Sequence, residues 1–199
     1  MGRNEEMNES IRKKRMEEIE GGALYYFAKY GLAGARISDL AKYLGISQGL
    51  LYRYYPSKEA LFKTCSQKWI STRDQIFKEL VEVKMSAEDK ILALTKHVET
   101  SMKKNKIFAC YFTIFENDSL TSGTKEGSLF FKWSAQPIKM LSKIIEQGQR
   151  EGTIHKGNSI QLSIGYWELV FAYSHNYIAS DSLENFDFNL LNRILLINR

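Results

Sequence analysis

The segment between Ile37 and Tyr54 carries the residue types and spacing that most directly indicate a chemistry. Two short amphipathic stretches flank a turn at residues 44–47, in which Gly45 can supply a positive φ and Ile46 can fill the wedge between two helices. In a helix-turn-helix of this kind, the second helix enters the major groove of DNA with its N-terminal residues foremost. The segment therefore predicts noncovalent recognition of DNA.

Side chains that could support catalysis or hold a metal show no matching pattern. His97, His155 and His175 do not combine with the cysteines at metal-ligand spacing, and neither a phosphate-binding glycine loop nor a Ser/His/Asp arrangement stands out. We therefore expect no enzyme, no metal and no cofactor, and keep an all-α enzyme with a site assembled in space as an alternative. Cys65 and Cys110 are expected to be buried free thiols, which indicates a reducing compartment.

The chain that must position these residues is expected to be all-α, with about nine helices. It contains only 2 prolines and lacks sustained alternation of apolar and polar residues, so strands are not indicated. Ser47 and Ser57 are expected to cap helices, and Pro137 to kink one. The expected helices span about residues 10–30, 37–44, 48–54, 57–83, 87–104, 107–117, 126–150, 160–180 and 183–197.

Two domains are predicted: a three-helix head with the helix-turn-helix over residues 1–56, and a larger helical domain over residues 57–199. The positive charge lies mainly at the N-terminal end. Residues 1–68 contain 12 Lys and Arg against 8 Asp and Glu, whereas the remaining residues contain 16 against 15. A basic N-terminal module on a nearly neutral body indicates a polyanionic partner, although such an excess also occurs on ordinary solvated faces.

The sequence gives no sign of a targeting or membrane segment. The first fifteen residues mix charges of both signs and have no apolar core, unlike a signal peptide. No uncharged apolar run approaches the roughly 18 residues that a membrane span needs. We expect a cytoplasmic protein with no membrane partner.

The flanks of the helix-turn-helix resemble the TetR family of bacterial regulators over about residues 12–65. The family's first helix, with a phenylalanine followed by glycine, is similar to residues 19–27 followed by Gly31. Ala35 and Arg36 depart from the family's usual threonines, so that a helix cap is lost, and Gly22 stands where alanine is usual. The family's second block is matched by Leu40, Ala41, Gly45, Ile46, Ser47, Gly49, Leu51, Tyr52, Tyr55, Ser57, Lys58, Glu59, Ala60 and Leu61.

The resemblance implies a set of DNA contacts centred on residues 48–54. Gln48 can offer a donor and an acceptor to adenine, Arg53 can read guanine, and Gly49 lets the backbone approach DNA. For Tyr52 the alternative role is packing in the core. Lys58 is expected to contact a phosphate, and its alternative role is that of a solvated surface charge. The implied contact residues are Arg36, Ser47, Gln48, Gly49, Leu50, Tyr52, Arg53, Tyr54 and Lys58.

For the larger domain the resemblance is one of layout, and it implies an effector pocket and a dimer interface formed by the last two helices. The many large aromatics are consistent with a pocket for a small lipophilic or aromatic effector, although for any single aromatic a place in an ordinary core is the favoured alternative. The expected ligand-binding residues are Trp69, His97, Phe108, Phe112, Phe115, Trp133 and Tyr166. Two strongly apolar terminal helices favour self-association. The expected dimerisation residues are Trp167, Phe171, Leu191, Ile194 and Leu195.

Together these features predict a ligand-responsive transcriptional repressor. A homodimer is expected to bind a double-stranded, pseudo-palindromic operator and to be released by its effector. One alternative is an activator or a chromosome-associated regulator of the same fold. Another is an interaction protein that has lost DNA binding, which the missing threonine cap leaves open.

Overall fold

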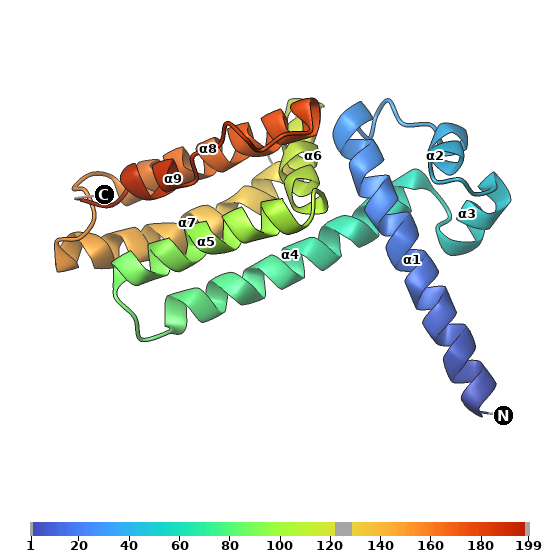
Figure 1. Cartoon of the computed structure of the whole chain (residues 1–199), viewed down its shortest axis with the longest axis horizontal. Coiled ribbons are helices and arrows are strands. Elements are labelled where there is room, and N and C mark those ends of the chain that lie inside the picture. The colour runs from blue at the N-terminus through green and yellow to red at the C-terminus, as the bar shows by residue number, and fades with distance from the viewer. Residues whose placement is uncertain (1, 122–128, 198–199) are drawn as a thin grey trace. The chain divides into compact units, whose positions relative to one another are not determined.

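The structure is a computed structural model that describes residues 2–121 and 129–197. Within these ranges it contains nine helices and no strand, which confirms the all-α prediction (Figure 1). The helices are α1 (Gly2–Tyr30), α2 (Ile37–Tyr43), α3 (Gln48–Tyr54), α4 (Lys58–Glu82), α5 (Ala87–Lys104), α6 (Ile107–Thr121), α7 (Leu129–Glu151), α8 (Ser159–Ser180) and α9 (Asn189–Arg193).

The chain divides into two compact units, Met1–Lys68 and Trp69–Arg199, called here the N-terminal and C-terminal units. The division lies inside α4, whereas the sequence placed a domain boundary after residue 56. The first turns of α4 belong to the N-terminal unit because their apolar side chains are buried there. Phe62, for example, packs edge-on against Phe27 of α1, with ring centroids 5.7 Å apart.

Local signals set the helix ends of the N-terminal unit as predicted. The Ser47 hydroxyl accepts a hydrogen bond from the backbone N–H of Leu50 at 3.1 Å, and so caps α3. The Ser57 hydroxyl accepts from the N–H of Ala60 at 3.1 Å at the start of α4. Arg36 precedes α2 without a side-chain cap, as expected from the missing threonine.

Two glycines explain how the short helices fit together. Gly45 has a φ of +64° in the turn between α2 and α3, a conformation that is costly for residues with a side chain. Gly22 lies in α1 where a Cβ would come within 2.3 Å of a methyl carbon of Leu44. The glycine therefore leaves room for the Leu44 side chain, which would have to shift if a Cβ were present.

The first and last helices differ from the sequence expectation. The first begins at Gly2 rather than near residue 10. The last has only five residues instead of extending over 183–197. Its backbone ends in an antiparallel pairing in which His155 N–H donates to Leu195 at 2.9 Å and Ile197 N–H donates to Thr153 at 3.0 Å. These bonds form an isolated bridge between Ile154 and Leu196, so the helix does not continue to residue 197.

The C-terminal unit is a helical bundle in which α8 packs on α6 and α7, and α5 packs on α7 and α9 (Figure 1). Its core includes Ile91, Leu141 and Val170, and Pro137 lies inside α7 as predicted. None of the helices in the described part of the chain is both long and apolar enough to cross a membrane.

Candidate nucleic-acid interface and effector cavity

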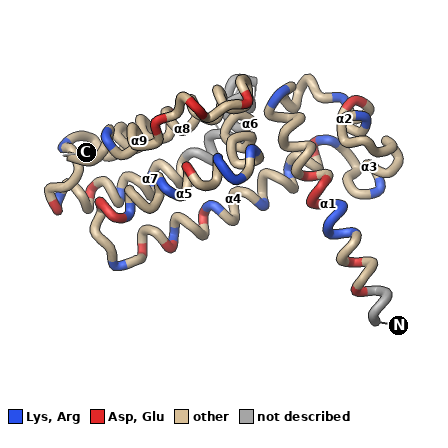
Figure 2. The backbone as a smooth tube through the Cα atoms, in the orientation of Figure 1, with Lys and Arg blue, Asp and Glu red and all other residues tan. Residues whose placement is uncertain are grey.

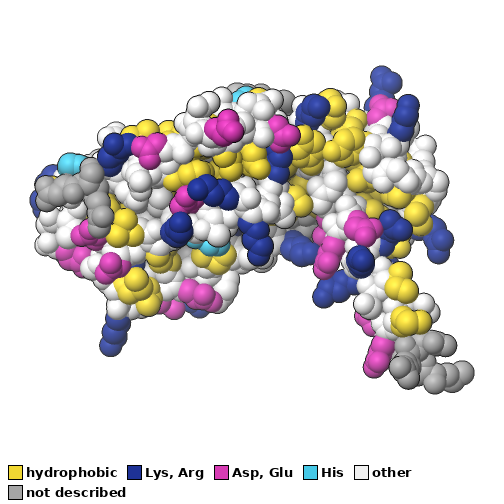
Figure 3. All heavy atoms as spheres, viewed as in Figure 1, with side chains coloured by type: hydrophobic (Ala, Val, Ile, Leu, Met, Phe, Trp, Pro, Cys, Tyr) yellow, Lys and Arg dark blue, Asp and Glu magenta, His cyan; other side chains and the backbone are white. Residues whose placement is uncertain are grey.

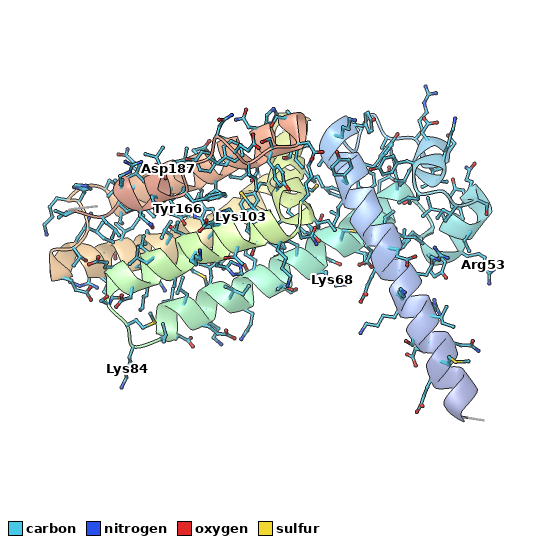
Figure 4. All side chains as sticks on the ribbon, viewed as in Figure 1. Arg53, Lys68, Lys84, Lys103, Tyr166 and Asp187 are labelled. Carbon is cyan, nitrogen blue, oxygen red and sulfur yellow. The ribbon has the colours of Figure 1, made fainter. Side chains whose placement is uncertain are left out.

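Helix α3 has one face in the core of the N-terminal unit and another in solvent. Leu51 is fully buried, whereas Gln48 and Arg53 are exposed and Tyr52 is 47% exposed. The alternative of core packing for Tyr52 is therefore wrong. Figure 4 shows Arg53 projecting away from the helix. This leaves a polar, hydrogen-bonding edge along α3 that a DNA groove can receive.

The N-terminal end of this edge is sterically open. A Cβ at Gly49 would meet no atom within 4 Å, so the space in front of the backbone there is empty. Leu50, beside it, is half-buried and Ser47 is exposed. The backbone at the start of α3 is thus accessible to a ligand as large as a nucleic-acid strand.

A buried hydrogen bond anchors the other end of α3 to α1. The phenol of Tyr55 donates to a carboxylate oxygen of Glu20 at 2.8 Å, and the Lys68 ammonium lies 3.3 Å from the other oxygen. Burial and the bond to Glu20 raise the pKa of Tyr55 well above its ordinary value. Sequence reasoning missed this pair, because Tyr55 was identified only as a matching position.

Lys58 has a different role from the predicted phosphate contact. Its ammonium donates to the backbone carbonyls of Leu32 at 2.9 Å, Ala33 at 3.4 Å and Ala35 at 2.6 Å. An ammonium has three N–H donors, and all three are directed into the loop between α1 and α2. The side chain therefore stabilises that loop. It is not the solvated surface charge that was the alternative prediction.

Basic side chains outnumber acidic ones in the N-terminal unit, with 12 Lys and Arg against 8 Asp and Glu in residues 1–68. Figure 2 shows Lys and Arg positions on α1, α2 and α3, and Figure 3 shows such side chains projecting from several sides of this region. Arg36, at the start of α2, is exposed, and Tyr54 at the end of α3 is half-buried. A charge distribution of this sign attracts the phosphate backbone of nucleic acid.

The C-terminal unit contains a narrow, mainly apolar cavity. It encloses about 410 Å³ of space not filled by atoms, its mouth included. The residues that line it are Trp69, Arg73, Ile76, Phe77, Leu94, His97, Val98, Phe108, Phe112, Pro137 and Trp167. An apolar cavity with a few polar groups is the usual form of a small-molecule site.

Four of the predicted ligand-binding residues line this cavity: Trp69, His97, Phe108 and Phe112. Tyr166 does not, because it is fully buried and its hydroxyl is hydrogen-bonded to that of Thr95 at 3.1 Å. The predicted residues Phe115 and Trp133 lie outside the residues whose side chains the structure describes.

The cavity has polar groups that the sequence did not reveal. Arg73 is almost completely buried and donates to the carboxylate of Asp74 at 2.6 Å, and burial lowers its pKa. The indole nitrogens of Trp69 and Trp167 are buried and have no hydrogen-bond partner among the described residues. His97 is partly exposed at the cavity, and burial lowers its pKa.

The structure corrects most of the predicted dimerisation residues. Leu191 and Leu195 are fully buried within the C-terminal unit, and Trp167 and Phe171 are 6% exposed. Trp167 packs edge-on against Phe77, with ring centroids 5.6 Å apart. These side chains therefore form core within the C-terminal unit instead of an external face. Of the predicted set, Ile194 retains partial exposure.

Another face of α8 remains exposed and partly apolar. Ile160 is 42% exposed and Ile164 is 39% exposed, and Glu168 and Ala172 continue the same face at intervals of four residues. These isoleucines were not among the predicted residues, because the segment that forms α8 is apolar nearly all round. Their spacing of four residues was the available signal.

The chain is similar in sequence to known proteins. Residues 21–65 match the family described as "Bacterial regulatory proteins, tetR family". An uncharacterised HTH-type transcriptional regulator of Bacillus subtilis, YezE, is 26% identical over 112 residues, which cover 56% of this chain and 54% of that protein. The chain thus matches about half the length of this curated relative.

Solved structures share the whole fold. A TetR-family regulator from Rhodococcus is 17% identical, with a TM-score of 0.66 over 91% of this chain and 96% of its own. FadR of Bacillus subtilis, in complex with stearoyl-CoA, is 18% identical, with a TM-score of 0.62 over 89% and 94%. The helix-turn-helix and its flanks, at residues 21–65, are thus similar to the DNA-binding part of the tetR family of bacterial regulatory proteins.

Proposed function

We propose that the protein is a DNA-binding transcriptional regulator that reads an operator with α3. The observation that carries the proposal is the exposed edge of α3 in a helix-turn-helix whose other face is fixed in the core. Gln48 offers a donor and an acceptor to a base edge, and Arg53 offers a guanidinium to guanine or phosphate. Arg36, Ser47, Leu50, Tyr52 and Tyr54 complete the proposed contacts, and Lys58 supports them from within the fold.

The protein acts as a homodimer on a pseudo-palindromic operator. Paired heads in successive major grooves need a self-complementary interface elsewhere in the chain. The exposed face of α8, with Ile160 and Ile164, supplies apolar surface for this purpose. Ile164→Glu places a charge on that face, and we expect it to give monomers in light scattering, whereas Leu190→Glu on α9 leaves the dimer intact.

Regulation is repression relieved by a small lipophilic or aromatic effector. The aromatic cavity supports an effector site, and a protein of similar fold, FadR of Bacillus subtilis, binds stearoyl-CoA. The buried indole N–H groups of Trp69 and Trp167 favour an effector that also carries an oxygen acceptor. Effector binding favours a dimer conformation in which the two heads no longer fit successive grooves.

The test begins with selection of duplexes from a random-sequence library by the full chain. The proposal expects a shared pseudo-palindromic sequence that the protein binds more tightly than random DNA in gel-shift titrations. Recovery of no preferred sequence at low salt would overturn it. A reporter carrying the selected sequence in a promoter then separates repression, in which deletion of the gene raises expression, from activation.

A second candidate is an interaction protein that keeps the fold without reading DNA. The observation in its favour is the uncapped start of α2 at Arg36. Replacement of Arg36 by threonine restores a cap. Under this candidate the wild type shows no sequence preference and the variant gains one, whereas our proposal expects selective binding by the wild type.

A further inference from the structure

A groove in the N-terminal unit joins the exposed half of α1 to α3. It encloses about 730 Å³ with its opening included and is lined mostly by polar groups. The residues that line it are Asn8, Ile11, Arg12, Leu50, Arg53 and Tyr54. Three of these belong to α1 and precede the helix-turn-helix, whereas the other three belong to α3.

Core packing does not account for the helical structure of the part of α1 that lines this groove. Among the α1 residues whose burial the structure describes, which begin at residue 6, Ile19 is the first buried side chain and none of residues 6–18 is buried. A helical segment of this length is marginally stable in water without a partner. Its side chains, including Ile11 at 60% exposure, are therefore available to a ligand that lies along α3.

The charged side chains of the groove favour an anionic ligand. Both charged residues in its lining are arginines, one from each wall, and the lining contains no carboxylate. Guanidinium groups pair with phosphate oxygens through two parallel hydrogen bonds. Because Leu50, Arg53 and Tyr54 also belong to the proposed reading edge of α3, a duplex that meets this edge brings its backbone to the groove.

We propose that the groove between Arg12 of α1 and Arg53 of α3 is a second contact site for the DNA backbone. It rests on the proposed function, because it extends the DNA contact beyond the helix-turn-helix. Arg12 binds a phosphate flanking the bases that α3 reads, while Asn8 and Tyr54 offer further hydrogen bonds. This contact stabilises the exposed half of α1, which the protein core leaves unsupported.

The experiment uses the full chain and a duplex that the wild type has selected from a random library. Arg12→Gln removes the proposed contact, and Lys13→Gln is the matched control. Lys13 carries the same charge, but it points about 100° away around the helix and does not line the groove. Dissociation constants are measured by fluorescence anisotropy from about 50 to about 200 mM salt.

We expect Arg12→Gln to bind the duplex about tenfold more weakly, as for one lost charged hydrogen bond. Its logarithmic salt dependence should fall by about 0.9, the value for one phosphate contact. Lys13→Gln should keep the salt dependence of the wild type. Arg12→Lys, which preserves the charge, should restore the salt slope, and this separates phosphate binding from a loss of helix structure.

Equal affinities and slopes for Arg12→Gln, Lys13→Gln and the wild type would overturn the groove site and leave the proposed function intact. An equal loss in both Gln variants would also overturn it, since the effect would then be one of net charge. If the wild type selects no duplex, both proposals fail.

Discussion

The ammonium of Lys58 donates to the backbone carbonyl of Ala35 over 2.6 Å, so the first residue of α4 closes the loop that leads into α2. Two further carbonyls of this loop, those of Leu32 and Ala33, accept from the same group. The orientation of the helix-turn-helix therefore depends on a lysine that lies outside it.

Replacement of Lys58 by methionine should lower the free energy of unfolding by about 1.5–3 kcal/mol, the usual contribution of hydrogen bonds to a charged group. The methionine keeps most of the packing of the stem but leaves carbonyls without their donor. Urea unfolding followed by circular dichroism measures the change. Lys63→Met on the exposed side of α4 is the control and should be nearly neutral. Equal stability of the two variants would contradict the role assigned to Lys58.

Replacement of Gln48 by alanine should weaken binding to the selected duplex by about 1–3 kcal/mol, the discrimination carried by one base contact. Binding to a random duplex should be unchanged, because phosphate contacts supply nonspecific affinity. Anisotropy titrations with both duplexes measure the two effects. Since Gln48 is exposed, the unfolding midpoint should stay within error. A loss of affinity shared by both duplexes would argue against base reading by this residue.

Replacement of Phe112 by alanine should destabilise the protein by about 3–5 kcal/mol. Phe112 is buried and its ring lies 5.2 Å from that of Phe108 and 5.4 Å from that of Phe171, measured between centroids. Phe112→Leu retains more volume and should cost less. Denaturant unfolding checks the order of the two variants, and a reversed order would show that the aromatic cluster is not well packed.

Acidification should destabilise the protein through His97. Burial lowers the pKa of this side chain, so the folded state binds a proton less readily than the unfolded state, whose value is about 6.5. The contribution of neutral His97 to the free energy of unfolding is therefore fully present above the unfolded-state pKa. It is lost as the pH falls from that pKa toward the lower pKa of the folded state. Comparison of unfolding free energies from about pH 7.5 to about pH 5.5 should give a smaller decrease for His97→Gln than for the wild type. The same decrease in both would assign it to other groups.

The two cysteines should resist alkylation in the folded protein. Both are free and buried, and burial raises the pKa of each thiol to about 12. The reactive species is the thiolate, which is then scarce at neutral pH. Mass spectrometry after iodoacetamide treatment should show no addition under native conditions and two additions in denaturant. Rapid native labelling would indicate frequent opening of the core around Cys65 or Cys110.

The sequence by itself determined the elements whose signals are local. A glycine with positive φ at Gly45, a hydroxyl cap at Ser47 and the breaks around Pro56 act on backbone groups within a few residues. Their effects do not need the rest of the fold, and α3 has the predicted bounds for this reason. The exposed edge of Gln48 and Arg53 follows from the same local helix geometry.

Only the tertiary structure decided how distant residues use their side chains. From the sequence, a lysine at the start of a helix is predicted to contact a phosphate. The fold instead brings the loop carbonyls near Ala35 within hydrogen-bonding distance of the Lys58 ammonium. Apolar residues such as Phe171 and Leu195 favour burial, and both are buried in this fold. The hydrophobic effect is not directional, so the sequence does not predict whether such a residue is buried by its own chain or by a partner. The backbone bonds between residues 195–197 and 153–155 likewise end the last helix early. The local sequence does not predict them, because they join segments that are far apart in the chain.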